Sequence, residues 1–142
     1  MKTKILVGIS FLGSSAAALL GGWDTSLKTL VIFMGTDWLT GGIILPAVFK
    51  KSPKSTSGTL ESNAGWKGIC RKVMILFCVL IAESLDALAG SDYLRDTVCI
   101  GFIANEALSI IENAGLMGLP LPPKLKKCID ILQTKDHDPD QR

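Results

Sequence analysis

Long apolar runs separated by short polar segments dominate this chain. The runs cover residues 5–22, 27–49, 73–89 and 97–119, and the fourth is the most polar of them. A helix rises about 1.5 Å per residue and the apolar core of a bilayer is about 30 Å thick, so runs of this length predict membrane-spanning helices. The pattern therefore predicts an all-α integral membrane protein with about four transmembrane helices, or three if the fourth run lies at the interface.

The first run has two interpretations. As a secretory signal peptide it would be cleaved, because two lysines precede it and three alanines at residues 16–18 resemble a cleavage site. As a retained helix it carries small residues at every fourth position, at Gly13, Ala17 and Gly21. Small residues at this spacing let membrane helices approach closely, so these three are the candidate helix-packing positions. Cleavage would leave three crossings in the same orientation.

The distribution of basic residues predicts the topology. Lys and Arg gather before the first run, in the segment 50–72 and after residue 123, whereas 21–28 and 90–96 hold few of them. Cytoplasmic segments of membrane proteins are enriched in these residues, so both termini and the 50–72 segment are predicted to be cytoplasmic. The predicted organisation is a membrane domain at 1–123 with a flexible basic cytoplasmic loop at 50–72, followed by a cytoplasmic tail at 124–142 that begins basic and ends acidic.

The composition agrees with a membrane protein and argues against several other classes. Hydrophobic residues make up 48% of the 142 residues, and the mean hydropathy of +0.39 is high for a soluble domain of this size. A formal net charge of +2 gives no basis for nucleic-acid binding. The four cysteines form no CxxC motif and the single histidine lies in the polar tail, so neither a disulfide framework nor a metal site is predicted.

No set of residues has the spacing of a catalytic or cofactor site, so the protein is predicted not to be an enzyme and to need no cofactor. Glu83 and Asp86 would suit acid–base chemistry in a cleft. Their spacing of three residues is more typical of one polar face of a helix.

Acidic residues inside the apolar runs need an explanation. Five acids lie within the runs: Asp37, Glu83, Asp86, Glu106 and Glu112. None of the runs contains an arginine. An ionised acid near the middle of a bilayer costs about 3 kcal/mol, so five facing lipid would cost on the order of 15 kcal/mol, as much as the whole stability of a domain. Counting along each run puts Asp37, Glu83 and Glu106 near one depth. The hypothesis is that these three form a polar interface within or between subunits; the alternative is ordinary polar contacts between helices with no transport role.

The stretch 105–125 is the most distinctive part of the chain. Five polar residues in its first half share one helical face: Asn105, Glu106, Ser109, Glu112 and Asn113. Two glycines and three prolines then follow between residues 115 and 123, and proline removes backbone donors, so the helix is predicted to end near Leu119. The candidate polar-interface or pore-lining residues are Asp37, Thr40, Glu83, Asp86, Asn105, Glu106, Ser109, Glu112 and Asn113.

This stretch resembles the C-terminal signature of the bacteriophage holin family, which includes the toxin-secretion and phage-lysis holins. The resemblance rests on the run NEALS at 105–109, on the glycines and prolines that follow, and on GGWD, DWLTG and GWKGI, which precede them in the order of the family. It covers residues 21–127. The segment 50–64 and the tail past Cys128 depart from the family pattern.

The resemblance implies a homo-oligomer in the bacterial cytoplasmic membrane. Such a protein assembles into lesions that collapse the membrane potential and release an endolysin, or in some relatives a large toxin, without forming a stable complex with it. Two other functions stay open. A small ion channel or transporter subunit would use Asp37 and Glu106 as ion or proton sites, and a structural membrane partner would recruit another protein and cause no leak.

Overall fold

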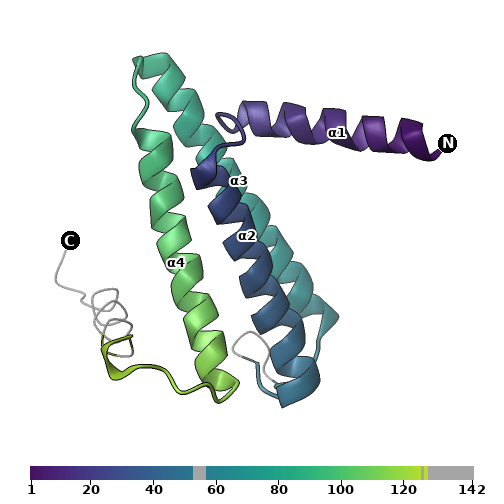
Figure 1. Cartoon of the computed structure of the whole chain (residues 1–142), viewed down its shortest axis with the longest axis vertical. Coiled ribbons are helices and arrows are strands. Elements are labelled where there is room, and N and C mark those ends of the chain that lie inside the picture. Colours follow the sequence, from purple (N-terminus) through teal and green to yellow (C-terminus); the bar gives the residue numbers. More distant parts are fainter. Residues whose placement is uncertain (53–56, 126, 128–142) are drawn as a thin grey trace.

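The protein is all-helical, as predicted. The computed structural model describes residues 1–52, 57–125 and 127, and no strand occurs among them. The elements in chain order are α1 (Lys2–Leu19), α2 (Thr25–Leu39), the π-helix η1 (Thr40–Phe49), α3 (Ser62–Ala89) and α4 (Leu94–Leu116) (Figure 1).

Local sequence signals explain where these helices begin and end. The Asp24 side chain accepts a hydrogen bond from the Leu27 backbone N–H at 2.9 Å, which caps the first turn of α2. Gly90 ends α3 in the left-handed conformation that glycine adopts without strain. Pro46 lies inside η1, where the wider π-helical turn continues α2 beyond Leu39.

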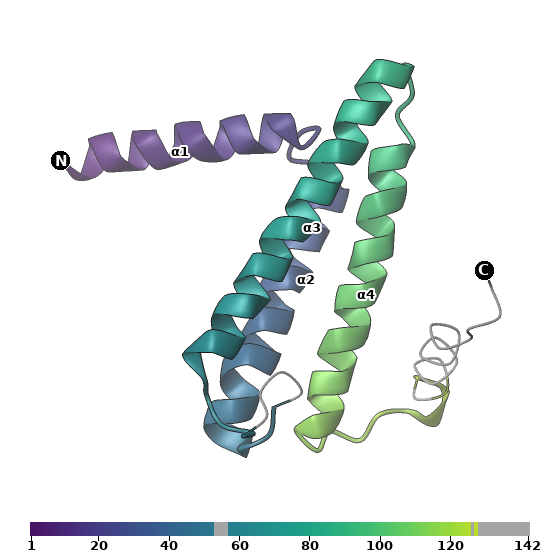
Figure 2. The ribbon, with the colours of Figure 1, turned by 180° about the vertical axis from the view of Figure 1, so that it is seen from behind.

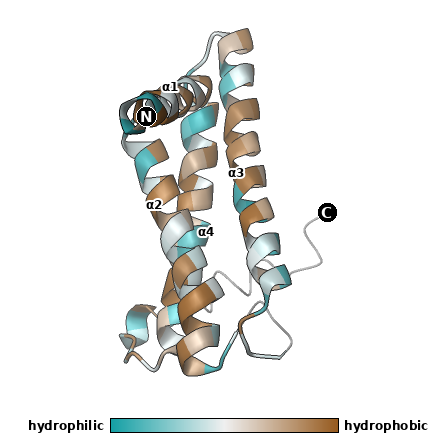
Figure 3. Cartoon of the chain, turned by 90° about the vertical axis from the view of Figure 1, so that its right-hand side faces the viewer, coloured by the Kyte–Doolittle hydropathy of each residue, from teal (hydrophilic) through white to brown (hydrophobic). Residues whose placement is uncertain are grey.

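Helices α2, α3 and α4 form a bundle, with α4 lying along α2 and α3 (Figures 1 and 2). Each helix contributes to one buried cluster made of Leu30, Met34, Val79 and Cys99. The outward surface is apolar as well: Met74, Phe77 and Ile81 on α3 are each at least half exposed. Figure 3 shows hydrophobic residues along much of this helix. An apolar outer surface is what a bundle surrounded by lipid requires, because lipid contact does not penalise it.

One stretch, Thr25–Phe49, is both long and apolar enough to cross a membrane by length and composition, among the residues that the structure describes. The four-crossing count is therefore not confirmed. The physical reason lies in the charged side chains of the other helices. Helix α1 contains Lys2 and Lys4, and α3 and α4 carry both acids and cations within their lengths.

Helix α1 projects away from the bundle at a steep angle (Figures 1 and 2). None of its residues is buried. The change of direction occurs at Gly21 (φ 88°) and Gly22 (φ 101°), both in the left-handed region that favours glycine. Gly21 therefore lies beyond the end of α1, where a Cβ would be 2.6 Å from Arg95 Nε and from Glu83 Oε2. Gly13 and Ala17 do lie on α1.

Two boundaries differ from the sequence prediction, and both differences place a cation inside the bundle. The basic loop was predicted to reach Lys72, but the chain is helical from Ser62, so Lys72 lies well within α3. The segment 90–96 was predicted to connect the third and fourth apolar runs, but α4 begins at Leu94 and includes Arg95. Most of the predicted tail, 126 and 128–142, lies outside the described residues.

Candidate functional site

Lys72 lies between two buried carboxylates inside the bundle. Its Nζ is 2.7 Å from Asp37 Oδ2 on α2, and it also donates a hydrogen bond to Glu106 Oε2 on α4. The Lys72 side chain is 15% exposed and each carboxylate only 3%, so all three charges are largely removed from solvent. The ammonium therefore joins the three helices of the bundle by charge-assisted hydrogen bonds.

Asn113 extends this arrangement toward η1. Its Nδ2 donates to Asp37 Oδ1 at 3.2 Å and to Thr40 Oγ1 at 2.9 Å. The Thr40 hydroxyl in turn donates to the Thr36 carbonyl oxygen at 2.8 Å. Gly41 allows this approach, because a Cβ at that position would lie 2.8 Å from Asn113 Nδ2. We name Asp37, Thr40, Lys72, Glu106 and Asn113 the Lys72 cluster.

A polar cavity of about 120 Å³ opens beside the Lys72 cluster. It is large enough for several water molecules. Asn105 and Ser109 of α4 line it from one side, and Gly68 and Arg71 of α3 line it from another. Asn105 and Ser109 do not contact Lys72, but they line the same cavity as the charged groups of the Lys72 cluster.

A second charged cluster surrounds Arg95, where the first turn of α4 meets the link between α1 and α2. The guanidinium makes a bidentate contact with Asp24, Nη1 to Oδ2 at 2.5 Å and Nη2 to Oδ1 at 3.1 Å. Its Nε donates to the Leu20 carbonyl oxygen at 2.7 Å, and Nη2 also donates to the carbonyl oxygen of Gly22 at 3.2 Å. Hydrogen bonding from Arg95 lowers the pKa of Asp24. We name Leu20, Gly22, Asp24 and Arg95 the Arg95 cluster.

Asp86 positions the start of α4 beside this second cluster. Its carboxylate accepts hydrogen bonds from the Ser91 hydroxyl at 2.6 Å, the Leu94 N–H at 3.2 Å and the Arg95 N–H at 2.8 Å. These bonds supply partners to backbone donors that no helix turn can satisfy. Asp86 is 3% exposed and acts as a structural cap.

The predicted site residues divide between these two regions. Asp37, Thr40, Glu106 and Asn113 meet in the Lys72 cluster, with Asn105 and Ser109 beside it, whereas Glu112 is exposed. Asp86 belongs to the other end of the bundle.

Within one chain, Glu83 does not join the interface of Asp37 and Glu106. Glu83 lies eleven residues beyond Lys72 on α3, which is about 16 Å along a helix. Its Oε2 is instead 4.0 Å from Arg95 Nε.

Sequence reasoning missed Lys72 and Arg95, the two residues at the centres of these clusters. Lys72 immediately precedes the apolar run at 73–89, and Arg95 lies two positions before the run at 97–119. A charged residue marks the end of an apolar run, so the sequence pattern places both residues in the polar connections. The sequence did offer one signal, the five acids inside the apolar runs. Buried carboxylates require cations, and Lys72 and Arg95 are the cations closest to the starts of the runs at 73–89 and 97–119.

Comparison with known proteins agrees with the sequence resemblance. The model of the bacteriophage holin family matches residues 14–134, most of the chain. A 14.9 kDa protein encoded in the nagH 3′ region of Clostridium perfringens is 38% identical over 130 residues, covering 90% of this chain and 92% of its own length. An uncharacterized protein of Listeria innocua is 34% identical over 143 residues, covering all of this chain and 96% of its own length.

A more distant relative carries a functional name. A probable holin of Bacillus phage phi105 is 27% identical over 124 residues, covering 87% of this chain and 84% of its own length. No solved structure matches the chain. The matching family is a family of membrane proteins and not of enzymes.

Proposed function

Because the chain belongs to the bacteriophage holin family, we propose that it is a holin of the bacterial cytoplasmic membrane. In this proposal, copies of the chain assemble into lesions that collapse the membrane potential and let a cytosolic endolysin, or a large toxin, leave the cell. The observation that carries the proposal is the family match over residues 14–134, together with the similarity to a probable phage holin. The apolar outer surface of the bundle supports the location.

The proposed topology has four crossings with both termini in the cytoplasm. The bundle supports three of them, because α2 with η1, α3 and α4 lie side by side and alternate in direction (Figures 1 and 2). A fourth crossing requires α1 to turn about Gly21 and Gly22 until it lies along the bundle, with a rearrangement of the contacts that Arg95 makes to Leu20 and Gly22. These positive-φ glycines provide a place where the chain can turn.

The Lys72 cluster gives the proposed holin two states of different polarity. Within one folded chain, Lys72 and Asn113 pair with the carboxylates and keep them away from lipid. Separation of the helices during assembly would break these contacts and place the same groups in water. The cluster thus stabilises the closed bundle and supplies a hydrophilic lining to an open one, because charged groups gain hydration when they leave a buried site.

Controlled expression in bacteria, with and without a cytosolic endolysin, tests the function. We expect membrane potential to fall abruptly, with culture density falling at the same moment only when the endolysin is present. Gradual, ion-selective leakage without enzyme release would instead favour an ion channel that uses the Lys72 cluster and its cavity. No effect on potential would favour a structural partner and reject both pore-forming functions.

The role of the acids is tested by Asp37→Asn combined with Glu106→Gln. We expect the double variant to change both the timing of lysis and the size of the oligomer, because the amides cannot form the charged contacts with Lys72. Asp92→Asn is the control, since Asp92 is an exposed acid in the connection between α3 and α4. Unchanged timing and oligomer size in the double variant would show that the acids are not a functional interface.

A further inference from the structure

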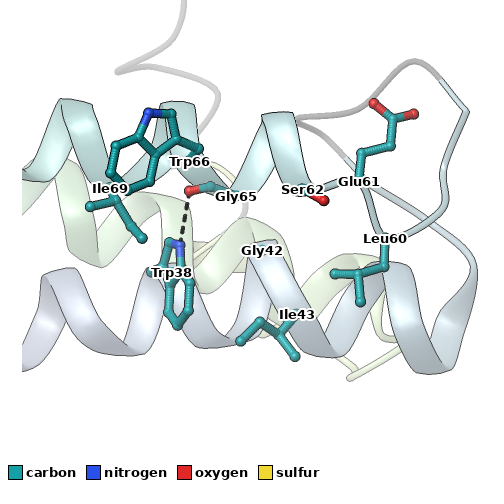
Figure 4. A pocket seen from close by; sticks show the side chains of 9 residues that line it. All are labelled: Trp38, Gly42, Ile43, Leu60, Glu61, Ser62, Gly65, Trp66 and Ile69. Atoms are coloured by element: carbon teal, nitrogen blue, oxygen red, sulfur yellow. Dashed lines mark hydrogen bonds between the residues drawn. The ribbon is translucent and has the colours of Figure 1, made fainter.

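An open apolar groove of about 450 Å³ lies at the end of the bundle where η1 and α3 approach each other. Trp38, Gly42 and Ile43 line one side of it, and the start of α3, with Trp66 and Ile69, lines the other (Figure 4). Trp66 is 66% exposed at the rim. The groove is separate from the Lys72 cluster and shares no lining residue with the polar cavity beside it.

Glycines give the groove its width. Trp38 lies against α3 at Gly68, where a Cβ would be 3.2 Å from Trp38 Cδ1. Its Nε1 donates a hydrogen bond to the Gly65 carbonyl oxygen at 3.2 Å, which fixes the indole as one wall (Figure 4). A Cβ at Gly65 would meet nothing within 4 Å, so the space beside that residue is open.

Basic side chains are concentrated near this end of the bundle. Lys50 and Lys51 follow η1, and their ammonium groups donate to the carbonyl oxygens of Ala47 at 3.1 Å and Leu116 at 3.3 Å. An ammonium has three donors, so each lysine retains capacity for an anion. Lys67 follows the rim residue Trp66.

The acid that lines the groove is directed elsewhere. Glu61 accepts a hydrogen bond from the Ser57 hydroxyl. In Figure 4 its carboxylate points away from Ile43 and Trp38. Its negative charge therefore does not occupy the apolar part of the groove.

We propose that this groove binds an acyl chain of an anionic phospholipid, with the lipid phosphate beside the lysines that follow η1. Three features match this ligand: an apolar groove with an open side, the exposed Trp66 at its rim, and lysines at the same end of the bundle. A site for a specific lipid goes beyond the proposed function but rests on its membrane topology, which places this end of the bundle in the cytoplasmic leaflet. A second copy of the chain is the competing occupant.

Fluorescence quenching by brominated lipids tests the site. In a Trp23→Phe background the two remaining tryptophans, Trp38 and Trp66, both line the groove and report on its occupant. The protein is reconstituted in mixed phosphatidylglycerol and phosphatidylcholine vesicles, with bromine on the acyl chains of one lipid at a time. We expect about fivefold stronger binding of brominated phosphatidylglycerol at equal mole fraction, as one phosphate–lysine contact predicts.

Gly65→Leu adds a bulky side chain at a residue that lines the groove, where a Cβ meets nothing within 4 Å. Gly35→Leu is the matched control, because a Cβ there also meets nothing within 4 Å. We expect Gly65→Leu to abolish the preference for phosphatidylglycerol and Gly35→Leu to preserve it. Equal quenching by both lipids would overturn the proposal in favour of ordinary lipid contact. Quenching that disappears as the protein-to-lipid ratio rises would overturn it in favour of a second copy.

This measurement is independent of lysis. Absence of a lipid preference in the Trp23→Phe protein, with lysis intact, rejects the lipid site alone. Preference without lysis rejects the holin function and leaves the lipid site standing.

Discussion

The two charged clusters of this bundle use their central cations differently. Arg95 contacts main-chain carbonyl oxygens of Leu20 and Gly22 as well as the Asp24 carboxylate, so its planar fork fixes the path of a turn. Lys72 contacts side chains only, through a compact ammonium that pairs with one carboxylate from each of two other helices. One cluster therefore contacts the main chain of a turn, whereas the other links side chains of three helices.

The two clusters also differ in how far their carboxylates are exposed to solvent. The carboxylates around Lys72 are each 3% exposed, but Asp24 is 46% exposed and Asp96, which also contacts Arg95, is 53% exposed. Water screens the charges around Arg95 and leaves those around Lys72 to interact at low dielectric. Substitutions at the Lys72 cluster should consequently have the larger effects on stability.

The largest effect is expected for Lys72→Met. It removes the cation and leaves Asp37 and Glu106 buried without it, which should lower the free energy of unfolding by about 3–5 kcal/mol. Denaturant titration of the protein in detergent, followed by circular dichroism, measures the change. Adding Asp37→Asn and Glu106→Gln to Lys72→Met should restore part of the loss; a triple variant as unstable as Lys72→Met would contradict the pairing.

Arg95→Lys should have an intermediate effect, about 2 kcal/mol, because lysine cannot reproduce the bidentate contact with Asp24 while also reaching two carbonyl oxygens. Amide hydrogen exchange of residues 20–25 should accelerate, since the turn loses its fixed partners. Arg71→Lys is the control, because Arg71 is exposed on α3. Unaltered exchange in Arg95→Lys would show that the turn is maintained by its glycines alone.

Asn113→Ala should cost about 1 kcal/mol. It removes the donor that joins Asp37 to Thr40, but Lys72 continues to contact Asp37. The same denaturant titration measures this difference, and a double-mutant cycle with Thr40→Val separates the Asn113–Thr40 contact. A loss as large as that of Lys72→Met would mean that hydrogen bonding, and not charge pairing, dominates this cluster.

The smallest effect is expected from protonation of Asp24. Its pKa is lowered by hydrogen bonding from Arg95, so this contact contributes stability above the ordinary aspartate pKa of about 3.9 and loses it as the pH falls through the lower folded value. Hydrogen exchange of residues 20–25, corrected for its intrinsic pH dependence, should therefore show loss of protection below about pH 4. Asp24→Asn should show no such transition; a transition that persists in this variant must come from another acid.

The buried polar pairs were only partly predictable. The five-residue stripe of α4 and the acid Asp37 were visible because polar residues are conspicuous in apolar runs. The depth argument joined Asp37 correctly to Glu106 but also included Glu83, because residue counting from uncertain run ends accumulates error along a helix. Lys72 was hidden by its position at the edge of a basic segment.

By itself the sequence determined that the chain is helical, that its helices are apolar along their outer surfaces and that polar side chains share a face of α4. These properties are local, since helical spacing and the effect of glycine and proline act over a few residues. Only the tertiary structure decided which acid meets which cation. Lys72 and Asp37 are 35 residues apart, and Arg95 and Asp24 are 71 apart, so their pairing depends on how whole helices pack and on where α1 leaves the bundle. No local pattern encodes that geometry, because it results from the simultaneous burial of apolar faces on three helices.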